Sequence, residues 1–154
     1  MRNVTYFPPY SQEENIVTNA VLLLFSHVNR LAPNLLQGIL NNLTDEELQL
    51  GPIFSNQVKG TKSVIDAVIS QTPFEIHIET KLGDALNEDQ IENHVDSIFA
   101  KHAKPHGELR PKITLLGLTK SPLHPEMLKK FQRLAKENSI YFAATTFLDV
   151  LEIL

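Results

Sequence analysis

The sequence predicts a mixed α/β fold in which a β-meander comes first and helices cover both faces of the sheet. Three observations support this prediction. Apolar residues recur at helical spacing in the first part of the chain, and the pattern changes after Pro52. Three strand-like segments then follow one another through short turns, as in a meander. Beyond them, helical and strand-like segments alternate, which favours a mixed sheet flanked by helices.

The first predicted helix begins at Ser11 and runs to about Leu31. Ser11 is a good N-cap residue, and Glu14 follows three residues later, as in a capping box. The apolar stripe of this helix consists of Ile16, Val17, Ala20, Val21, Leu24 and Val28.

A weaker helical stretch follows Pro33. Thr44 and Glu47 then form a second capping box, which predicts another short helix that starts at Thr44. The Gly51-Pro52 pair ends this helix, because glycine favours a helix C-terminus and proline cannot continue one.

Three strands should form the meander, and their residues are 53–58 (IFSNQV), 63–70 (SVIDAVIS) and 74–81 (FEIHIETK). The middle strand is expected at the centre of the sheet, because both of its faces are apolar apart from Asp66. Alternation places Val64, Asp66 and Val68 on one face and Ile65, Ala67 and Ile69 on the other.

After the meander, Asn87 is expected to cap a helix that ends before Pro105. Its inward stripe is predicted to be Ile91, Val95, Ile98 and Phe99. The remaining predicted elements are a strand at 112–118, an amphipathic helix at 121–139 and a strand at 140–147.

The length of 154 residues suits a single domain, 1–154. The last eight residues, FLDVLEIL, form an apolar, helix-like segment without a stop signal. We therefore expect either that the chain is the N-terminal domain of a longer protein or that its end packs on another copy, as in a homodimer.

Composition excludes several functions. The chain has no cysteine, so disulfides, cysteine-ligated zinc and thiol catalysis are impossible. No apolar run approaches the roughly twenty residues that span a bilayer, so we expect a cytoplasmic protein. The net charge of -4 gives no general attraction for polyanions. Two local groups of basic residues are interpreted first as solvated faces. They are Lys101, Lys104, Arg110 and Lys112, and Lys129, Lys130, Arg133 and Lys136.

Asp66, Glu79 and Lys81 are the residues that carry chemistry. Glu79 and Lys81 are two apart on a predicted strand, so they share a face. A short turn between the second and third strands brings Asp66 opposite the segment from Glu75 to Glu79. Two carboxylates, with the Thr80 carbonyl as a third oxygen, suit a hard cation such as Mg²⁺. The lysine would orient water or stabilise charge on phosphorus.

This arrangement, IDAVIS followed by IHIETK, resembles the PD-(D/E)XK nuclease superfamily, in which an aspartate precedes glutamate-x-lysine on a β-meander. The resemblance covers nearly the whole chain and implies a restriction-endonuclease-like fold. It implies that Asp66, Glu79 and Thr80 bind a metal and that Lys81 is catalytic. Glu14 resembles an additional outer metal ligand of some members.

The helix after the third strand adds a further point of resemblance. Gln90 matches a glutamine that many members carry there, which makes it another candidate catalytic residue. His94 stands where an aromatic residue is frequent, and Ile65 stands where proline often precedes the aspartate. The position of Ile65 is variable in the family, whereas the histidine puts a role of His94 as a base or phosphate contact in doubt.

The resemblance implies a Mg²⁺-dependent phosphodiesterase, with Mn²⁺ able to substitute. The expected substrate is DNA, cut internally, in a restriction or antiviral defence setting. Nothing in the sequence separates a DNA substrate from RNA. The main alternative is a catalytically silent nucleic-acid-binding or scaffolding module of the same fold.

Each candidate residue also has a structural interpretation. Glu79 and Lys81 can be a simple ion pair at a strand end. Glu14 and Gln90 each stand three residues after a good cap, where a capping box uses Glu or Gln, and Glu13 competes with Glu14 for the site.

Three histidines are further candidates. The spacing of His102 and His106 suits a metal site, but Pro105 interrupts the helix and favours surface loop histidines. His77 either contacts substrate or is a hydrogen-bonded histidine of the sheet.

Overall fold

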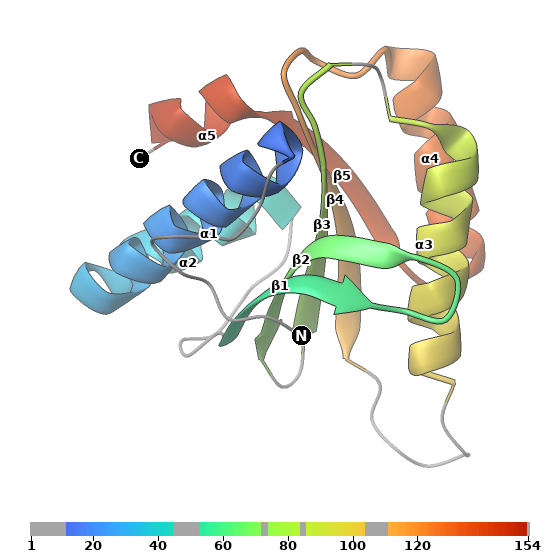
Figure 1. Cartoon of the computed structure of the whole chain (residues 1–154), viewed down its shortest axis with the longest axis horizontal. Coiled ribbons are helices and arrows are strands. Elements are labelled where there is room, and N and C mark those ends of the chain that lie inside the picture. Colours follow the sequence, from blue (N-terminus) through green and yellow to red (C-terminus); the bar gives the residue numbers. More distant parts are fainter. Residues whose placement is uncertain (1–11, 45–52, 72–73, 84–85, 104–110, 154) are drawn as a thin grey trace.

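The computed structural model describes residues 12–44, 53–71, 74–83, 86–103 and 111–153 (Figure 1). The helices are α1 (Glu13–Leu31), α2 (Pro33–Thr44), α3 (Glu88–Lys101), α4 (Pro125–Glu137) and α5 (Phe147–Ile153). The strands are β1 (Ile53–Lys59), β2 (Val64–Gln71), β3 (Phe74–Lys81), β4 (Lys112–Thr119) and β5 (Tyr141–Thr146).

The five strands form one mixed sheet in the order β1-β2-β3-β4-β5. The first three pair antiparallel, whereas β3-β4 and β4-β5 pair parallel. Parallel neighbours need a crossover connection, and α3 and α4 supply the two crossovers. The predicted mixed α/β class with a meander first is therefore confirmed.

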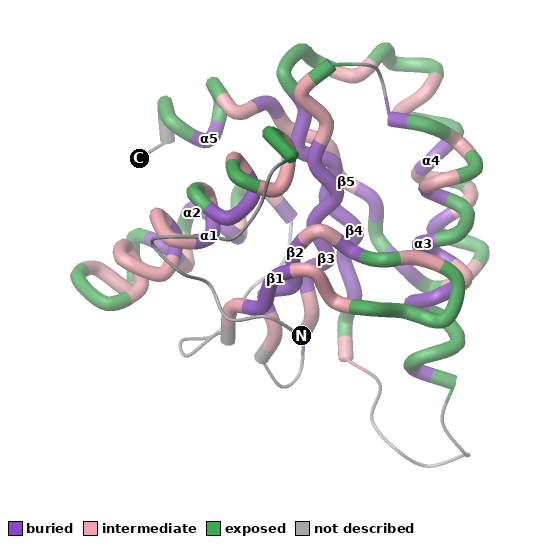
Figure 2. Tube along the Cα trace, in the orientation of Figure 1, coloured by how far each residue is buried: buried purple, intermediate pink, exposed green. Residues whose placement is uncertain are grey.

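Helices cover both faces of the sheet. In Figure 1, α1, α2 and α5 lie on one side of it and α3 and α4 on the other. The buried apolar residues form two clusters, one with α1 and α2 and one with α3 and α4. Figure 2 shows the buried positions concentrated in the central strands and on the sides of the helices that face them. Burial of these two clusters is the main source of stability.

The face that α1 turns toward the sheet differs from the predicted stripe. Its buried residues are Thr18, Asn19, Leu22 and Phe25, whereas Ile16 is 42% exposed. Two polar residues take buried places because they hydrogen-bond to the strands, as described below. The N-cap of α1 is Gln12, one residue later than predicted, and Ser11 lies outside the described residues.

The predictions for the other helices have different outcomes. Thr44 is the last residue of α2, and its hydroxyl donates to the Leu40 carbonyl. The short helix predicted to start at Thr44, including Glu47, lies outside the described residues. Asn87 caps α3 as predicted, accepting from the Asp89 amide. Phe99, however, is 43% exposed, so the inward stripe of α3 ends at Ile98.

The middle strand does not alternate regularly along its whole length. Ala67 and Ile69 belong to the cluster under α1, whereas Ile65 packs with the cluster under α3. The prediction that these three residues share one face of the sheet is therefore wrong for Ile65. The change of side occurs at Asp66, opposite Gln57, whose φ of 48° is a left-handed conformation that only a few per cent of residues other than glycine adopt.

Candidate metal-dependent active site

The strand register brings the predicted carboxylates together. The paired residues of β2 and β3 run from Ala67–Ile78 to Gln71–Phe74. Asp66 immediately precedes Ala67, and it accepts a hydrogen bond from the Thr80 amide, next to Glu79. The sequence predicted Asp66 near Glu75 to Glu79, and Asp66 lies at the Glu79 end of that range.

Asp66 is held by two hydrogen bonds. Its Oδ2 accepts from the Thr80 amide at 2.9 Å, and its Oδ1 accepts from Gln57 Nε2 at 3.2 Å. The pKa of Asp66 is raised to about 6, first by burial and then by the negative charge of Glu79. The two hydrogen bonds and the charge of Lys81 oppose this rise only in part. A carboxyl group with this pKa in a polar cluster is typical of a functional site.

Glu79 is almost completely buried, with 1% of its surface exposed. One carboxylate oxygen, Oε1, accepts a hydrogen bond from Gln90 Nε2. The other, Oε2, lies 2.8 Å from His94 Nε2. Both partners come from α3, one helical turn apart, so this helix fixes the position of the carboxylate.

Lys81 lies between two carboxylates. Its Nζ is 3.6 Å from Glu79 Oε1 and 3.4 Å from Glu14 Oε2. The Lys81 side chain is 19% exposed, so most of it is shielded from solvent. The pair is therefore more than the exposed ion pair considered from the sequence.

Glu14, and not Glu13, reaches the site. Besides its contact with Lys81, Glu14 Oε1 accepts from the Leu82 amide at 3.3 Å. Glu13 is exposed. The side chains of Glu14 and Gln90 contact Lys81 and Glu79, respectively, and not a helix cap. A Glu or Gln three residues after an N-cap can therefore contact either the cap or a distant strand. The sequence alone does not distinguish these two contacts.

Thr80 connects the site to α1. Its amide binds Asp66, and its hydroxyl shares a 2.7 Å hydrogen bond with that of Thr18. In an antiparallel pair the N–H and C=O groups of one residue point to the same side of the strand. The Thr80 carbonyl therefore faces the side on which Asp66 lies, as the predicted third oxygen ligand requires.

Amide side chains of β1 and α1 form hydrogen bonds that hold Asp66 in place. The sequence did not predict these contacts. Gln57 Nε2, which binds Asp66, also donates to Asn15 Oδ1 at 2.7 Å. Next to it, Asn56 Nδ2 donates to Asn19 Oδ1 at 3.0 Å. The only sequence signal was the polar pair Asn56-Gln57 within a predicted strand, opposite the aspartate.

His94 has a definite role in the geometry, although it departs from the family pattern. Its Nδ1 lies 2.8 Å from Ser63 Oγ, while its Nε2 meets Glu79. The imidazole therefore bridges the start of β2 and the end of β3. This position makes it a positioning residue for Glu79.

A cavity of about 260 Å³ adjoins Lys81. Its lining includes a second cation, Lys120, and the side chains of Thr119, Ser121 and His124. Thr119 pairs with Lys81 in the parallel ladder, so this lining continues from the end of β3. Pro122, Leu123 and Met127 complete the lining, so the cavity is a largely apolar hollow that carries two lysines at the edge of the candidate site.

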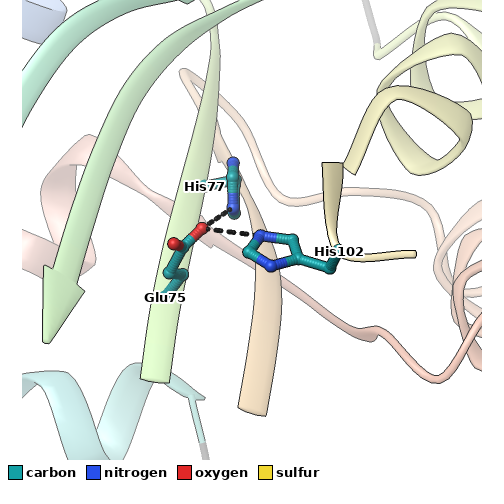
Figure 3. Close-up of side chains that lie close together, drawn as sticks. All are labelled: Glu75, His77 and His102. Carbon is teal, nitrogen blue, oxygen red and sulfur yellow. Dashed lines mark hydrogen bonds and ion pairs between the residues drawn. The ribbon is translucent and has the colours of Figure 1, made fainter. Parts of the chain in front are cut away.

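A second polar cluster lies farther back on β3, and the sequence did not predict it. Glu75 Oε2 is 2.9 Å from His77 Nε2, 3.0 Å from His102 Nε2 and 2.8 Å from Lys101 Nζ (Figure 3). His102 is thus a buried partner of Glu75, and its assignment to the surface is wrong. His77 is a hydrogen-bonded histidine of the sheet, and His106 lies outside the described residues.

The charge states of this cluster follow from its environment. Burial lowers the pKa of His77, although Glu75 opposes the effect. Burial would raise the pKa of Glu75, but hydrogen bonds from His77 and Lys101 outweigh it and hold the pKa at about 2. Near neutral pH the carboxylate is therefore charged and the His77 imidazole is neutral.

The predicted basic groups are partly neutralised. Lys101 pairs with Glu75, and Lys130 pairs with Glu88 at 2.6 Å. Lys104 and Arg110 lie outside the described residues. These contacts favour the interpretation of both groups as ordinary surface charges.

Comparisons with known proteins add little. The sequence matches no protein-family model and no curated protein. Among solved structures, the chain is similar to one titled as Pyrococcus furiosus SfsA in complex with Ca²⁺, with 13% identity and a TM-score of 0.43. The similarity covers 70% of this chain and 52% of that chain, so this chain spans about half of that protein.

Among the described residues, no helix is both long enough and apolar enough to cross a membrane.

Proposed function

We propose that this chain is a metal-dependent nuclease domain with a restriction-endonuclease-like fold, which hydrolyses phosphodiester bonds. The observation that carries the proposal is the convergence of Asp66, Glu79 and Lys81 at one end of the meander, beside a partly cationic cavity. The expected substrate is DNA, cut internally, and the expected setting is restriction-like or antiviral defence. The last two points derive from the family resemblance.

The oxygen atoms present fit a hard divalent cation. Asp66 and Glu79 offer carboxylate oxygens, and the Thr80 carbonyl is on the same side as Asp66. Oxygen donors of this kind suit Mg²⁺, with Mn²⁺ able to substitute. When bound, such a cation supplies positive charge that offsets the charge on the scissile phosphate and favours ionisation of water.

The rest of the chemistry belongs to the chain. Lys81 lies within 3.6 Å of Glu79 Oε1 and extends to the cavity beside it. From there its ammonium group can donate hydrogen bonds to a phosphate oxygen as negative charge develops in the transition state. Glu14 holds the ammonium in place and serves as the additional outer ligand that the resemblance implies.

Gln90 and His94 act by positioning Glu79. Their two contacts use one site on each carboxylate oxygen. An ionised carboxylate has about four acceptor sites, so Glu79 retains capacity for a cation. Gln90 is therefore proposed to act through the orientation of Glu79 and not through direct proton transfer.

The cavity next to Lys81 is the proposed place for the nucleic-acid backbone. It offers Lys81 and Lys120 as cations and Ser121 as a further hydrogen-bonding residue. Phosphate contacts of this kind fix a strand without reading its sequence. The same chemistry accepts DNA or RNA, so the substrate class has to be measured.

A second function, a non-catalytic nucleic-acid-binding or scaffolding module, is favoured by one specific observation. Glu79 is buried, and both of its carboxylate oxygens already contact α3. In that case Glu79 would bridge β3 and α3 as a structural element, and Lys81 would anchor a phosphate.

The two functions separate in a cleavage assay. The protein is incubated with supercoiled plasmid, linear duplex, single-stranded DNA and RNA in Mg²⁺, Mn²⁺ or EDTA. A nuclease should cut at least one substrate in either metal and none in EDTA. Asp66→Asn and Glu79→Gln should each abolish cutting because the cation loses one of two carboxylates.

The matched control is Asp96→Asn, which makes the same substitution in an exposed ion pair with Lys62. This variant should cut like the parent. If the parent cuts no substrate in any metal but binds nucleic acid, the module replaces the nuclease as the function.

A further inference from the structure

We propose that Glu75, His77 and His102 form a binding site for a transition metal of the zinc class, separate from the oxygen-rich centre of Asp66 and Glu79. The three ligand atoms lie within 4.8 Å of one another. They come from two elements that already pack together, the start of β3 and the residue that caps the end of α3. Figure 3 shows both imidazoles directed at the same carboxylate oxygen.

The donor set identifies the class of metal. Two imidazole nitrogens and a carboxylate oxygen are a common ligand set for zinc. Mg²⁺ and Ca²⁺ take oxygen ligands, so they have no matched site here. Cysteine is absent from the chain, which leaves histidine as the nitrogen or sulfur ligand that a zinc-class ion prefers.

In a tetrahedral site with bonds near 2.0–2.1 Å, adjacent donor atoms are separated by about 3.3 Å. Glu75 Oε2 is now 2.9 Å from His77 Nε2 and 3.0 Å from His102 Nε2, so each of these two distances has to open by a few tenths of an ångström. The three ligand atoms lie within 4.8 Å of one another, and the two imidazole nitrogens have to settle at the same tetrahedral separation around the ion. Three protein ligands leave the fourth position for water or another ligand.

A second observation comes from the buried ring of His77. Its Nδ1 has no hydrogen-bond partner among the described residues, and the residue is 1% exposed. A metal-binding histidine usually donates its other N–H to an acceptor, often water. A cavity of about 20 Å³ is lined in part by His77 and Lys101, and a space of this size holds about one water molecule.

A cavity next to His102 gives solvent access to the proposed metal site. His102 lines a cavity of about 220 Å³, together with Pro111 and Lys112 at the start of β4. The His102 and Glu75 side chains are 10% and 16% exposed, respectively. An ion can therefore reach these two ligands without unfolding of the sheet.

Lys101 is the competitor for the site. Its Nζ contacts Glu75 Oε2 at 2.8 Å, and its side chain is 45% exposed. The ammonium occupies an acceptor site on the same oxygen that the metal requires. Because nearly half of the Lys101 side chain is exposed, its ammonium group can turn to solvent when an ion takes its place on Glu75.

A metal ion in this site would connect the C-terminal end of α3 to β3. Near its N-terminus, α3 contacts Glu79 through Gln90 and His94, and at its C-terminus His102 contacts Glu75. A bound ion replaces the second of these contacts with coordination bonds. The proposal does not depend on nuclease activity, because its ligands are different residues.

The test is calorimetric titration of metal-stripped protein with Zn²⁺ in excess Mg²⁺, which occupies any hard-oxygen centre. One equivalent of Zn²⁺ should bind in the parent and in Asp66→Asn. His102→Ala and Glu75→Gln should each weaken binding by about 10²-fold or more, since loss of even an outer partner costs 10–100-fold. His27→Ala, a partly exposed histidine on α1, is the matched control and should bind like the parent.

Lys101→Met provides a test that does not remove a ligand. Loss of the competing ammonium should tighten Zn²⁺ binding by a few fold, whereas a purely structural ion pair would leave no Zn²⁺ site to improve. Co²⁺ substitution should give the strong visible absorption of a four-coordinate site. Absence of stoichiometric Zn²⁺ binding in both the parent and Lys101→Met, or binding unchanged in Glu75→Gln, would overturn the proposal.

Discussion

Asp66→Asn is expected to stabilise the metal-free protein near neutral pH, although it removes a candidate ligand. The pKa of Asp66 is raised from 3.8 to about 6, mainly by burial. A shift of this size corresponds to about 3 kcal/mol at 1.36 kcal/mol per unit. The folded state therefore binds the Asp66 proton more tightly than the unfolded state does, and ionisation of the group opposes folding.

The sign fixes the pH window. Below pH 3.8 the carboxyl is protonated in both states, and its contribution to stability is fully present. As the pH rises through about 6, that contribution is lost. Asparagine does not ionise, so the free energy of unfolding of the variant, relative to the parent, should rise between these limits and then level off.

One hydrogen bond reduces the expected gain. In the variant, the side-chain carbonyl of the new asparagine could still accept from the Thr80 amide, but its amino group would face the Gln57 amide that now donates to Asp66. A mismatch of this kind costs about 1 kcal/mol. The net stabilisation at pH 7.5 should therefore be about 2 kcal/mol, less than the full effect of the pKa shift.

Urea unfolding between pH 4 and 8, in EDTA, measures this difference. Asp96→Asn, which changes the same charge in an exposed pair with Lys62, should alter stability by less than about 1 kcal/mol. A difference for Asp66→Asn that does not vary with pH, or that falls as the pH rises, would refute the electrostatic account of this residue. Addition of Mg²⁺ should then stabilise the parent and not the variant, by linkage.

Three other outcomes follow from the same geometry. Mn²⁺ binding is measured by calorimetry in His102→Ala, which lacks a ligand of the second cluster. Adding Asp66→Ala to this variant should abolish Mn²⁺ binding. Equal binding with and without Asp66→Ala would show that Asp66 is not a ligand of the metal centre. Thr18→Val should lower the free energy of unfolding by about 1–2 kcal/mol because Thr80 loses its hydroxyl partner, whereas Thr18→Ser should not. Gly117→Ala should cost about 1–3 kcal/mol in urea unfolding, since its Cβ would lie 2.5 Å from Leu86 Cδ1; an unchanged midpoint would contradict the packing.

The sequence predicted the strands of the meander well because their signals are local. The run 74–81 was predicted as a strand with the bounds that β3 has, and Asn87 was recognised as the cap of α3. Short antiparallel connections also restrict register, so the approach of Asp66 to Glu79 could be predicted to within a few residues.

What could not be predicted depends on distant contacts. Thr18 and Asn19 appear as polar interruptions in an amphipathic helix, yet they are buried because Thr80 and Asn56 accept or donate across the interface. Hydrophobic periodicity cannot detect such pairs, because it assigns every polar residue to the solvent face.

The second cluster was missed for a similar reason. Pro105 after the helix favours a surface position for His102, but His102 is the C-cap of α3 and is buried. Its partner Glu75 lies 27 positions earlier, and no local spacing connects the two. The sequence also leaves the contact of Gln90 undecided, because a glutamine at this position can contact either the helix cap or Glu79 on β3.

The most direct measurement of the proposed nuclease function compares cleavage and binding in Lys81→Met. Because the ammonium should act on charge that develops in the transition state, the single-turnover cleavage rate in Mg²⁺ should fall by about 10² or more. Affinity for the same DNA in Ca²⁺, which is expected to block turnover, should stay within a few fold of the parent. Lys136→Met, an exposed lysine on α4, controls for the loss of charge. A parent that cuts no nucleic acid in any metal, together with weaker binding by Lys81→Met, would contradict the nuclease and support the binding module.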